Sequence, residues 1–263
     1  MNSNQVCAIG TNRGVVRWVA DGYRAWLTPQ KFALGERNPY TDVFAVDYQV
    51  GHPEVLLFGG RPNRMWIADH RQPCARWDAL TVPSSIAHIR SVNEYQVLVA
   101  GLQNNLAIYD LRFRKSSNNN SSSSSSNHNN SKNNRSRKHH KRNKKNDAPF
   151  ALTDANVDVA RPLLTFPEYR NAAHFGMGLD YDAGTGVAAA AHDDGRVALF
   201  SVRDGRRLRC AALDAVRSDR GPVRSLRFRA FPRDHDVPSL FVGLQSNINV
   251  YSFGAGALDN DDL

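Results

Sequence analysis

The stretch QVLVAGLQNNLAIYDLR, which runs from Gln96 to Arg112, decides the fold. It consists of an apolar run, a polar turn and a second apolar run that carries Tyr109. The first run is apolar without alternation, which is typical of a strand in a sheet covered on both faces. Asparagine tolerates the positive backbone angles of a tight turn, so Asn104 and Asn105 favour a hairpin. The stretch therefore predicts two antiparallel strands joined by a tight turn.

Four other stretches repeat this pattern. They are QVCAIGTNRGVVRWV from Gln5, EVLLFGGRPNRMWIADHR from Glu54, GVAAAAHDDGRVALFSV from Gly186 and SLFVGLQSNINVYSF from Ser239. One position in the second strand of the copies is taken by Trp18, Ala68, Tyr109, Phe200 and Tyr251. Ala68 and Tyr109 lie 41 residues apart, and a period of about 40–45 residues is typical of propellers and stacked arrays. We therefore expect function on the faces of a repeat scaffold.

Further apolar runs flank the hairpins and supply the first and fourth strands of each unit. Those before a hairpin are residues 43–46, 86–89, 177–181 and 223–228, and those after one are residues 24–27, 163–166 and 208–211. Four strands per unit, with no long helical pattern, predict an all-β fold: a β-propeller of four-stranded antiparallel blades. The first copy begins at its second strand and the last ends at its third, which predicts about four and a half blades.

Such a propeller is incomplete. An unclosed ring leaves unpaired strand edges that invite aggregation. We therefore expect the chain to be the C-terminal part of a longer propeller, and the alternative is that another chain supplies the missing blades. The expected parts are residues 1–115 and 148–254 for the propeller, 116–147 for an insert and 255–263 for a flexible acidic tail.

The insert is rich in Asn and Ser at first and basic afterwards. The chain has a formal net charge of +9. Most of this charge lies in the insert, which has no acidic residue before Asp147 and carries Lys132, Arg135, Arg137, Lys138, Lys141, Arg142, Lys144 and Lys145. With almost no apolar side chain to bury, the insert is expected to be disordered. Its position predicts a loop expansion between the third and fourth strands of one blade, while the rest of the chain is nearly neutral.

Three interpretations of the basic tract, Arg135 to Lys145, remain open. It is a solvated loop expansion without a partner, a nuclear-import signal bound by an acidic groove of a carrier, or a nonspecific contact to the phosphates of RNA or DNA. No aromatic residue interrupts the tract, so base stacking is not expected.

The sequence carries no motif for catalysis, a cofactor or a metal. It has no Gly-rich phosphate loop followed by Lys, no His-Glu-x-x-His and no Gly-x-Ser-x-Gly. No apolar run is long enough to span a bilayer. The cysteines, Cys7, Cys74 and Cys210, are far apart and odd in number, as expected in a reducing compartment. We expect a soluble, noncatalytic protein of the nucleus or the cytoplasm that needs no cofactor.

Two Asp-x-Arg boxes are the most specific local motif that could form a functional site. Asp69-His70-Arg71 and Asp110-Leu111-Arg112 follow equivalent strands 41 residues apart, which predicts equivalent corners of neighbouring blades. The aspartate can accept hydrogen bonds from backbone amides of the turn, and the arginine fork can bind carboxylates or carbonyls of a partner. The alternative is that both boxes only brace their own turns.

At these boxes the chain resembles the WD-repeat family, with Tyr109-Asp110 where Trp-Asp is usual. Two successive boxes are also similar to those of WD-repeat substrate receptors of cullin-4 ubiquitin ligases. The stretches Ser84 to Arg112, Ala173 to Val202 and Val250 to Phe253 resemble the C-terminal part of an adaptor-associated factor of those ligases. The first box departs from the pattern, with Ala68 where an aromatic residue is usual.

The resemblance implies specific partners. Asp69, Arg71, Asp110 and Arg112 would face the damaged-DNA-binding adaptor subunit of cullin-4 ligases, and an unidentified substrate protein would bind elsewhere. The alternatives are an RNA- or chromatin-associated factor that binds through the basic tract, and a generic assembly scaffold.

Overall fold

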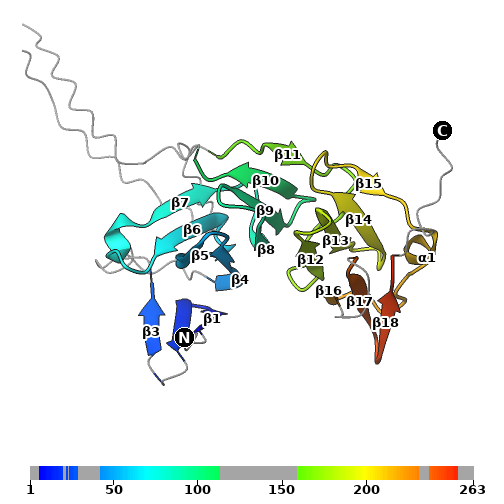
Figure 1. Cartoon of the computed structure of the whole chain (residues 1–263), viewed down its shortest axis with the longest axis horizontal. Coiled ribbons are helices and arrows are strands. Elements are labelled where there is room, and N and C mark those ends of the chain that lie inside the picture. Colours follow the sequence, from blue (N-terminus) through cyan, green and yellow to red (C-terminus); the bar gives the residue numbers. More distant parts are fainter. Residues whose placement is uncertain are drawn as a thin grey trace, which may run out of the picture. The chain divides into compact units, whose positions relative to one another are not determined.

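The computed structural model describes residues 6–19, 22, 24–28, 42–112, 159–230 and 237–253. These residues form five antiparallel sheets (Figure 1). In chain order the sheets are β1 (Val6–Thr11), β2 (Gly14–Val19), β3 (Arg24–Leu27); β4 (Asp42–Gln49), β5 (His52–Arg61), β6 (Arg64–Asp69), β7 (Asp78–Thr81); β8 (Ile86–Ser91), β9 (Gln96–Gly101), β10 (Leu106–Asp110), β11 (Leu164–Thr165); β12 (Leu179–Asp182), β13 (Val187–Ala191), β14 (Val197–Ser201), β15 (Arg207–Leu208); and β16 (Ser225–Arg229), β17 (Ser239–Leu244), β18 (Asn247–Tyr251).

The strand count of the sheets confirms the predicted all-β fold. The described residues give three four-stranded sheets flanked by two three-stranded ones, which is the arrangement that the repeats predict. One expected strand, residues 208–211, is partly wrong. The strand β15 ends at Leu208, and the chain then enters the short helix α1 (Ala211–Asp214). The run of Ala and Leu there favours a helical turn.

The hairpins β5–β6, β9–β10 and β13–β14 share one register. Tyr109 pairs with Val97, and Phe200 pairs with Ala188 at the equivalent position. The turn between β9 and β10 holds Gln103 and Asn104 at φ of 57° and 58°, the left-handed region that asparagine tolerates. The predicted tight hairpin is therefore confirmed.

The core lies between the sheets. In β9 and β13 every apolar residue from the second position onward is buried, as the unbroken apolar runs predict. Side chains from β9 and β10, β13 and β14, and β16 and β17 share one cluster. Trp18 in β2 is an exception, because 43% of its surface is exposed. The guanidinium of Arg24 lies over its ring, 4.8 Å from the ring centroid.

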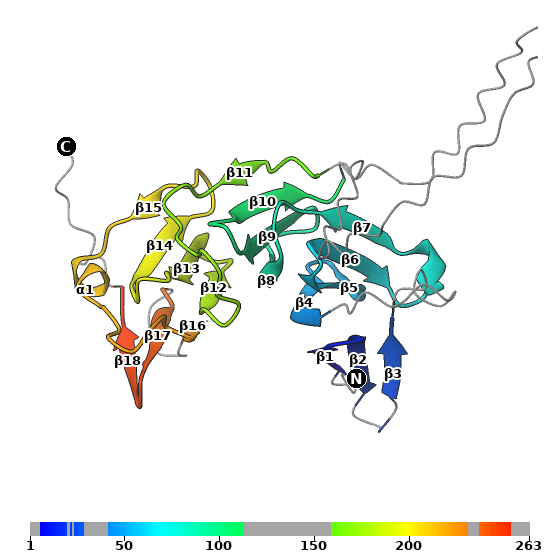
Figure 2. The same ribbon diagram turned by 180° about the vertical axis from the view of Figure 1, so that it is seen from behind.

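The third and fourth strands of one sheet bracket the predicted insert. β11 pairs with β10 through Ala107 and Thr165, and through Ile108 and Leu164, and Figure 2 shows the two strands side by side. Residues 113–158, which separate them in sequence, lie outside the described residues.

Because neighbouring strands are antiparallel, the strand ends and turns of each sheet lie along two opposite borders, and each border is called an edge. β4, β6, β8 and β10 run in one direction, so the β4–β5 and β8–β9 turns lie at the same edge as the ends of β6 and β10. This edge is called the box edge, because both Asp-x-Arg boxes follow those ends. The β5–β6, β9–β10, β13–β14 and β17–β18 turns lie at the opposite edge.

Candidate functional site at the box edge

In the second box, the arginine and the aspartate form a bidentate ion pair. The backbone N–H of Arg112 donates to Oδ1 of Asp110 at 2.8 Å, and Nη2 of the same arginine donates to Oδ2 at 2.6 Å. Nε of Arg112 lies 3.0 Å from Oδ1. Only 3% of the Asp110 side chain is exposed, against 58% of Arg112. The aspartate is therefore fixed in the turn, and the arginine lies on the surface.

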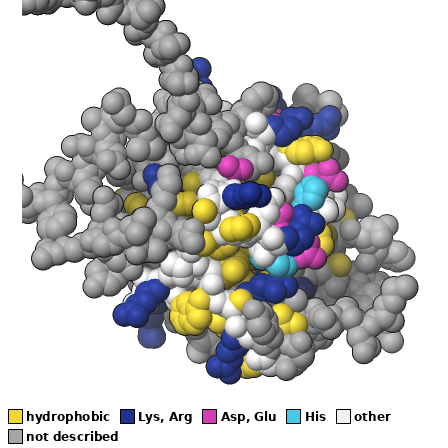
Figure 3. Space-filling model, turned by 90° about the vertical axis from the view of Figure 1, so that its left-hand side faces the viewer, with side chains coloured by type: hydrophobic (Ala, Val, Ile, Leu, Met, Phe, Trp, Pro, Cys, Tyr) yellow, Lys and Arg dark blue, Asp and Glu magenta, His cyan; other side chains and the backbone are white. Residues whose placement is uncertain are grey.

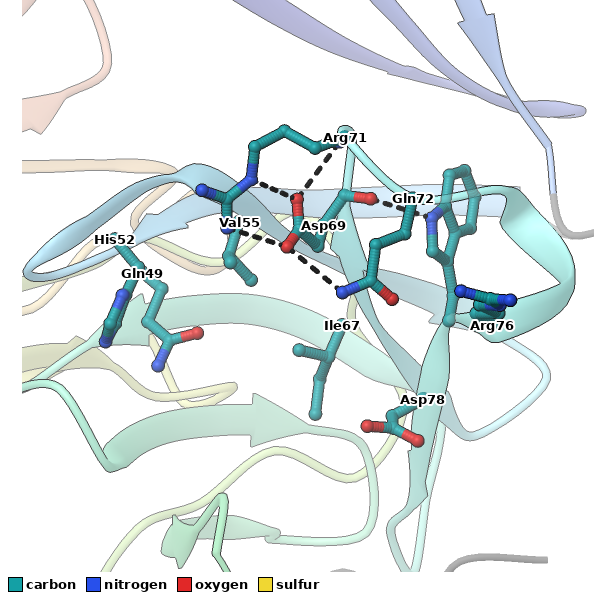
Figure 4. A pocket seen from close by; sticks show the side chains of 10 residues that line it. Gln49, His52, Val55, Ile67, Asp69, Arg71, Gln72, Arg76 and Asp78 are labelled. Atoms are coloured by element: carbon teal, nitrogen blue, oxygen red, sulfur yellow. Dashed lines mark hydrogen bonds and ion pairs between the residues drawn. The ribbon is translucent and has the colours of Figure 1, made fainter. Parts of the chain in front are cut away.

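The first box has the same geometry (Figure 4). The backbone N–H of Arg71 donates to Oδ1 of Asp69 at 3.0 Å, and its Nε and Nη2 donate to Oδ1 and Oδ2 at 2.9 and 2.8 Å. The Arg71 side chain is 64% exposed. The indole N–H of Trp77 donates to the carbonyl oxygen of Asp69 at 3.2 Å, so the connection between β6 and β7 also fixes this corner.

Both arginines fold back on their own aspartates. The reason is the spacing: in a turn, residue i+2 brings its Nε and Nη2 side by side opposite the carboxylate, which favours a bidentate pair. Nη1 of Arg71 has no hydrogen-bond partner among the described residues. Each box thus braces its turn and still presents a guanidinium to solvent.

The two bidentate ion pairs keep both aspartates in the charged state. The hydrogen bond from Arg71 lowers the pKa of Asp69 to about 2. The hydrogen bond from Arg112 likewise lowers the pKa of Asp110, because a nearby cation favours the carboxylate.

The surroundings of the two arginines differ. The guanidinium of Arg112 lies over the ring of Tyr95, 4.8 Å from its centroid, and Tyr95 is itself exposed. Arg71 borders a hollow of about 300 Å³ that Gln49, His52, Gln72 and Arg76 also line. The box edge therefore offers one cationic corner beside an aromatic ring and one beside a polar hollow.

Sequence reasoning missed two further Asp-x-Arg pairs. Arg206 lies 3.6 Å from Asp204 at the box edge, and Arg196 lies 3.5 Å from Asp194 in the β13–β14 turn at the opposite edge. In β14 the position of Asp110 is taken by Ser201, and Asp204 comes three residues later. Both pairs carry glycine between the aspartate and the arginine, a spacing that is visible in the sequence.

The basic tract from Arg135 to Lys145 lies outside the described residues, as does the acidic tail. Figure 3 shows basic, acidic and apolar side chains mixed on the described part of one side of the molecule. The described residues contain no group of three or more His, Cys, Asp or Glu side chains placed to hold a metal ion. Among the same residues, no helix is both long and apolar enough to cross a membrane.

Comparison with known proteins identifies the fold. No protein-family model matches the sequence, and no curated protein matches it. The WD40 β-propeller domain of Doa1 is similar in structure, with a TM-score of 0.57 and 9% identity over 98% of this chain and 64% of that one. The computationally designed protein Ika8 has a TM-score of 0.52 and 10% identity over 97% of this chain and 58% of its own.

These likenesses establish the fold alone. The chain has a β-propeller fold, and its described residues form about four and a half blades. It spans about three-fifths of the length of both similar structures. Each sheet described above is a blade or part of one.

Proposed function

We propose that this chain is a noncatalytic interaction scaffold that docks on the damaged-DNA-binding adaptor subunit of a cullin-4 ubiquitin ligase and serves as a substrate receptor. One observation carries the proposal. Arg71 and Arg112 lie at equivalent corners of neighbouring blades, each held by a bidentate aspartate and each more than half exposed. A guanidinium fixed in this way loses little side-chain freedom when a partner binds it.

The neighbours of the arginines support a protein partner. Tyr95 places an exposed aromatic ring beside Arg112, and Tyr and Arg are the residue types enriched where protein interfaces bind most strongly. Val50, which is also exposed, donates its backbone N–H to Oγ of Ser91 in the next blade. The two blades therefore present their exposed apolar side chains at one edge.

Affinity purification of the tagged chain from cell lysate, followed by mass spectrometry, tests the proposal. The account expects the cullin-4 adaptor among the specifically retained proteins. If other proteins are retained without the adaptor, the ligase assignment is wrong and the chain is a generic scaffold.

The basic tract supports a second candidate function, RNA or chromatin association, with nuclear import through a carrier as a further use of the same residues. Arg135, Arg137, Lys138, Lys141, Arg142, Lys144 and Lys145 form a run that can replace counterions on phosphates. The chain would then be retained on nucleic acid in a strongly salt-dependent way. Deleting residues 116–146 separates the candidates, because only nucleic-acid retention depends on them.

A further inference from the structure

Two arginines at the opposite edge line the same hollow. Arg220 and Arg224 are both exposed, and neither forms an ion pair with any described residue. Several other described arginines are each paired with an aspartate, as in Arg61–Asp42, Arg71–Asp69, Arg112–Asp110, Arg196–Asp194, Arg206–Asp204 and Arg207–Asp214. Arg220 and Arg224 therefore retain their full capacity to bind an anion.

The same two arginines line a hollow of about 470 Å³. Its walls are the segment before β16 and the β17–β18 turn, which contribute Ser218, Gln245 and Ser246, and no acidic residue is among its described lining residues. Hydroxyl and amide groups can donate hydrogen bonds to an oxyanion, and guanidinium groups bind carboxylates with two parallel bonds. The chemistry of the hollow fits a carboxylate.

The walls of the hollow are held in place by the backbone. The N–H of Ser218 donates to the carbonyl oxygen of Gly195 at 2.9 Å, which anchors the segment to the β13–β14 turn. Gly195 has a φ of +83°, and a Cβ there would lie 2.5 Å from the carbonyl oxygen of Ser218. The hollow is thus built against a turn that only glycine fits.

An aromatic pair lies at the same edge. Phe44 in β4 and Phe175 before β12 have ring centroids 4.5 Å apart, and Phe44 is 41% exposed. Arg61 covers both rings at 5.4 and 5.3 Å and is held by Asp42 at 2.6 Å. The pair joins the second and fourth blades and presents apolar surface at the opposite edge.

One short segment connects the aromatic pair to the hollow. The N–H of Gly178 donates to the carbonyl oxygen of Val223 at 2.8 Å. Phe175 lies three residues before Gly178, and Arg224 directly follows Val223. Apolar and cationic groups are therefore neighbours along this edge.

We propose that the opposite edge binds an acidic peptide, with carboxylates in the hollow at Arg220 and Arg224 and an apolar side chain against Phe44 and Phe175. A peptide fits better than a nucleic acid, because Arg61 already covers the rings on which a base would stack. This binding goes beyond adaptor docking and does not depend on it, because the box edge stays free.

The test measures the fluorescence anisotropy of a fluorescein-labelled peptide of glutamates around one central phenylalanine, titrated with the full chain. R220A combined with R224A is expected to weaken binding by about tenfold or more, and F175A by about tenfold. R206A is the matched control, an exposed arginine at the box edge, and is expected to bind like the unmodified chain. Circular dichroism of each variant checks that it is folded.

Three outcomes would overturn the proposal. The first is equal peptide affinity of the unmodified chain and the R220A/R224A variant. The second is equal binding of a peptide in which lysines replace the glutamates. The third is a single-stranded RNA that displaces the peptide and itself depends on Arg220 and Arg224, which would make nucleic acid the ligand. Adaptor binding is also measured on the R220A/R224A variant. If this variant still binds the adaptor, a failure of the peptide proposal does not affect the docking proposal.

Discussion

The carboxylate of Asp180 in β12 accepts the backbone N–H of Phe228 in β16 at 2.8 Å, across the boundary between two blades. Asp47 in β4 accepts the N–H of Ser91 in β8 at the same distance. The equivalent bond therefore recurs between two other neighbouring blades. Because a buried acceptor must be paired to remain buried, these aspartates fix the contact between the first strands of adjacent blades.

Replacing Asp180 should destabilise the fold. Arg90 and Arg227, from the blades on either side, lie 3.4 and 3.3 Å from its Oδ1, so D180A removes a charged partner from both and a hydrogen bond from Phe228. We expect the free energy of unfolding to fall by about 2 kcal/mol, measured by urea denaturation. D204A, which removes an exposed carboxylate, should leave the free energy of unfolding nearly unchanged. Equal effects of the two variants would contradict this account of the blade boundary.

Stability should fall below neutral pH because of His88. Its Nε2–H donates to the carbonyl oxygen of Met177, which joins two blades, and burial lowers the pKa of His88 to about 4. An unfolded histidine titrates near pH 6.5. Between those values the unfolded chain binds the proton and the folded chain does not, so acid favours unfolding.

The measurement is the free energy of unfolding between about pH 7 and pH 5 for the unmodified chain and for H88Q, which keeps a donor but does not titrate. The unmodified chain should lose more stability over this range than H88Q. Parallel curves would show that His88 is not the group responsible.

The two members of a box should have separable roles. D110N removes charge from a side chain that is almost fully buried and should lower the free energy of unfolding by about 1 kcal/mol, besides weakening adaptor binding. R112A removes an exposed partner, so it should leave stability nearly unchanged while weakening adaptor binding. Thermal unfolding and binding are measured on both variants. A stability loss in R112A as large as that in D110N would mean that the box only braces its turn.

Removal of the insert should leave the propeller folded. β10 and β11 pair directly, so a short Gly-Ser linker in place of residues 116–146 keeps that sheet intact. A loop of roughly half the length lowers the entropy cost of closure by about 0.6 kcal/mol, and urea denaturation should show unchanged or slightly higher stability. Adaptor binding should persist. Its loss, together with loss of retention on nucleic acid, would favour the basic tract as the functional element.

The fold was predictable because the hairpin is a local structure. Seventeen consecutive residues contain the apolar run 97–100, the left-handed turn at Asn104 and Tyr109, and the same pattern recurs along the chain. The short outer strands were harder to place. β15 has two residues and continues into α1, and such a strand is defined by pairing with β14, not by its own periodicity.

The candidate sites were predictable only in part. The boxes are visible as a motif, but that Arg71 and Arg112 lie against their own carboxylates depends on backbone geometry in the turn. The hollow at Arg220 and Arg224 could not be read from the sequence, because segments far apart in the chain form it. Phe44 and Phe175 likewise meet across a whole intervening blade.

The most direct test of the central claim is the affinity of the purified adaptor subunit for the full chain and for R71A combined with R112A, measured by isothermal titration calorimetry. The account predicts that the double variant is folded, with unchanged thermal stability, and that adaptor binding is lost. The R206A chain, which alters another Asp-x-Arg pair at the box edge, should bind like the unmodified chain. Undiminished binding by the double variant would contradict docking through the two boxes.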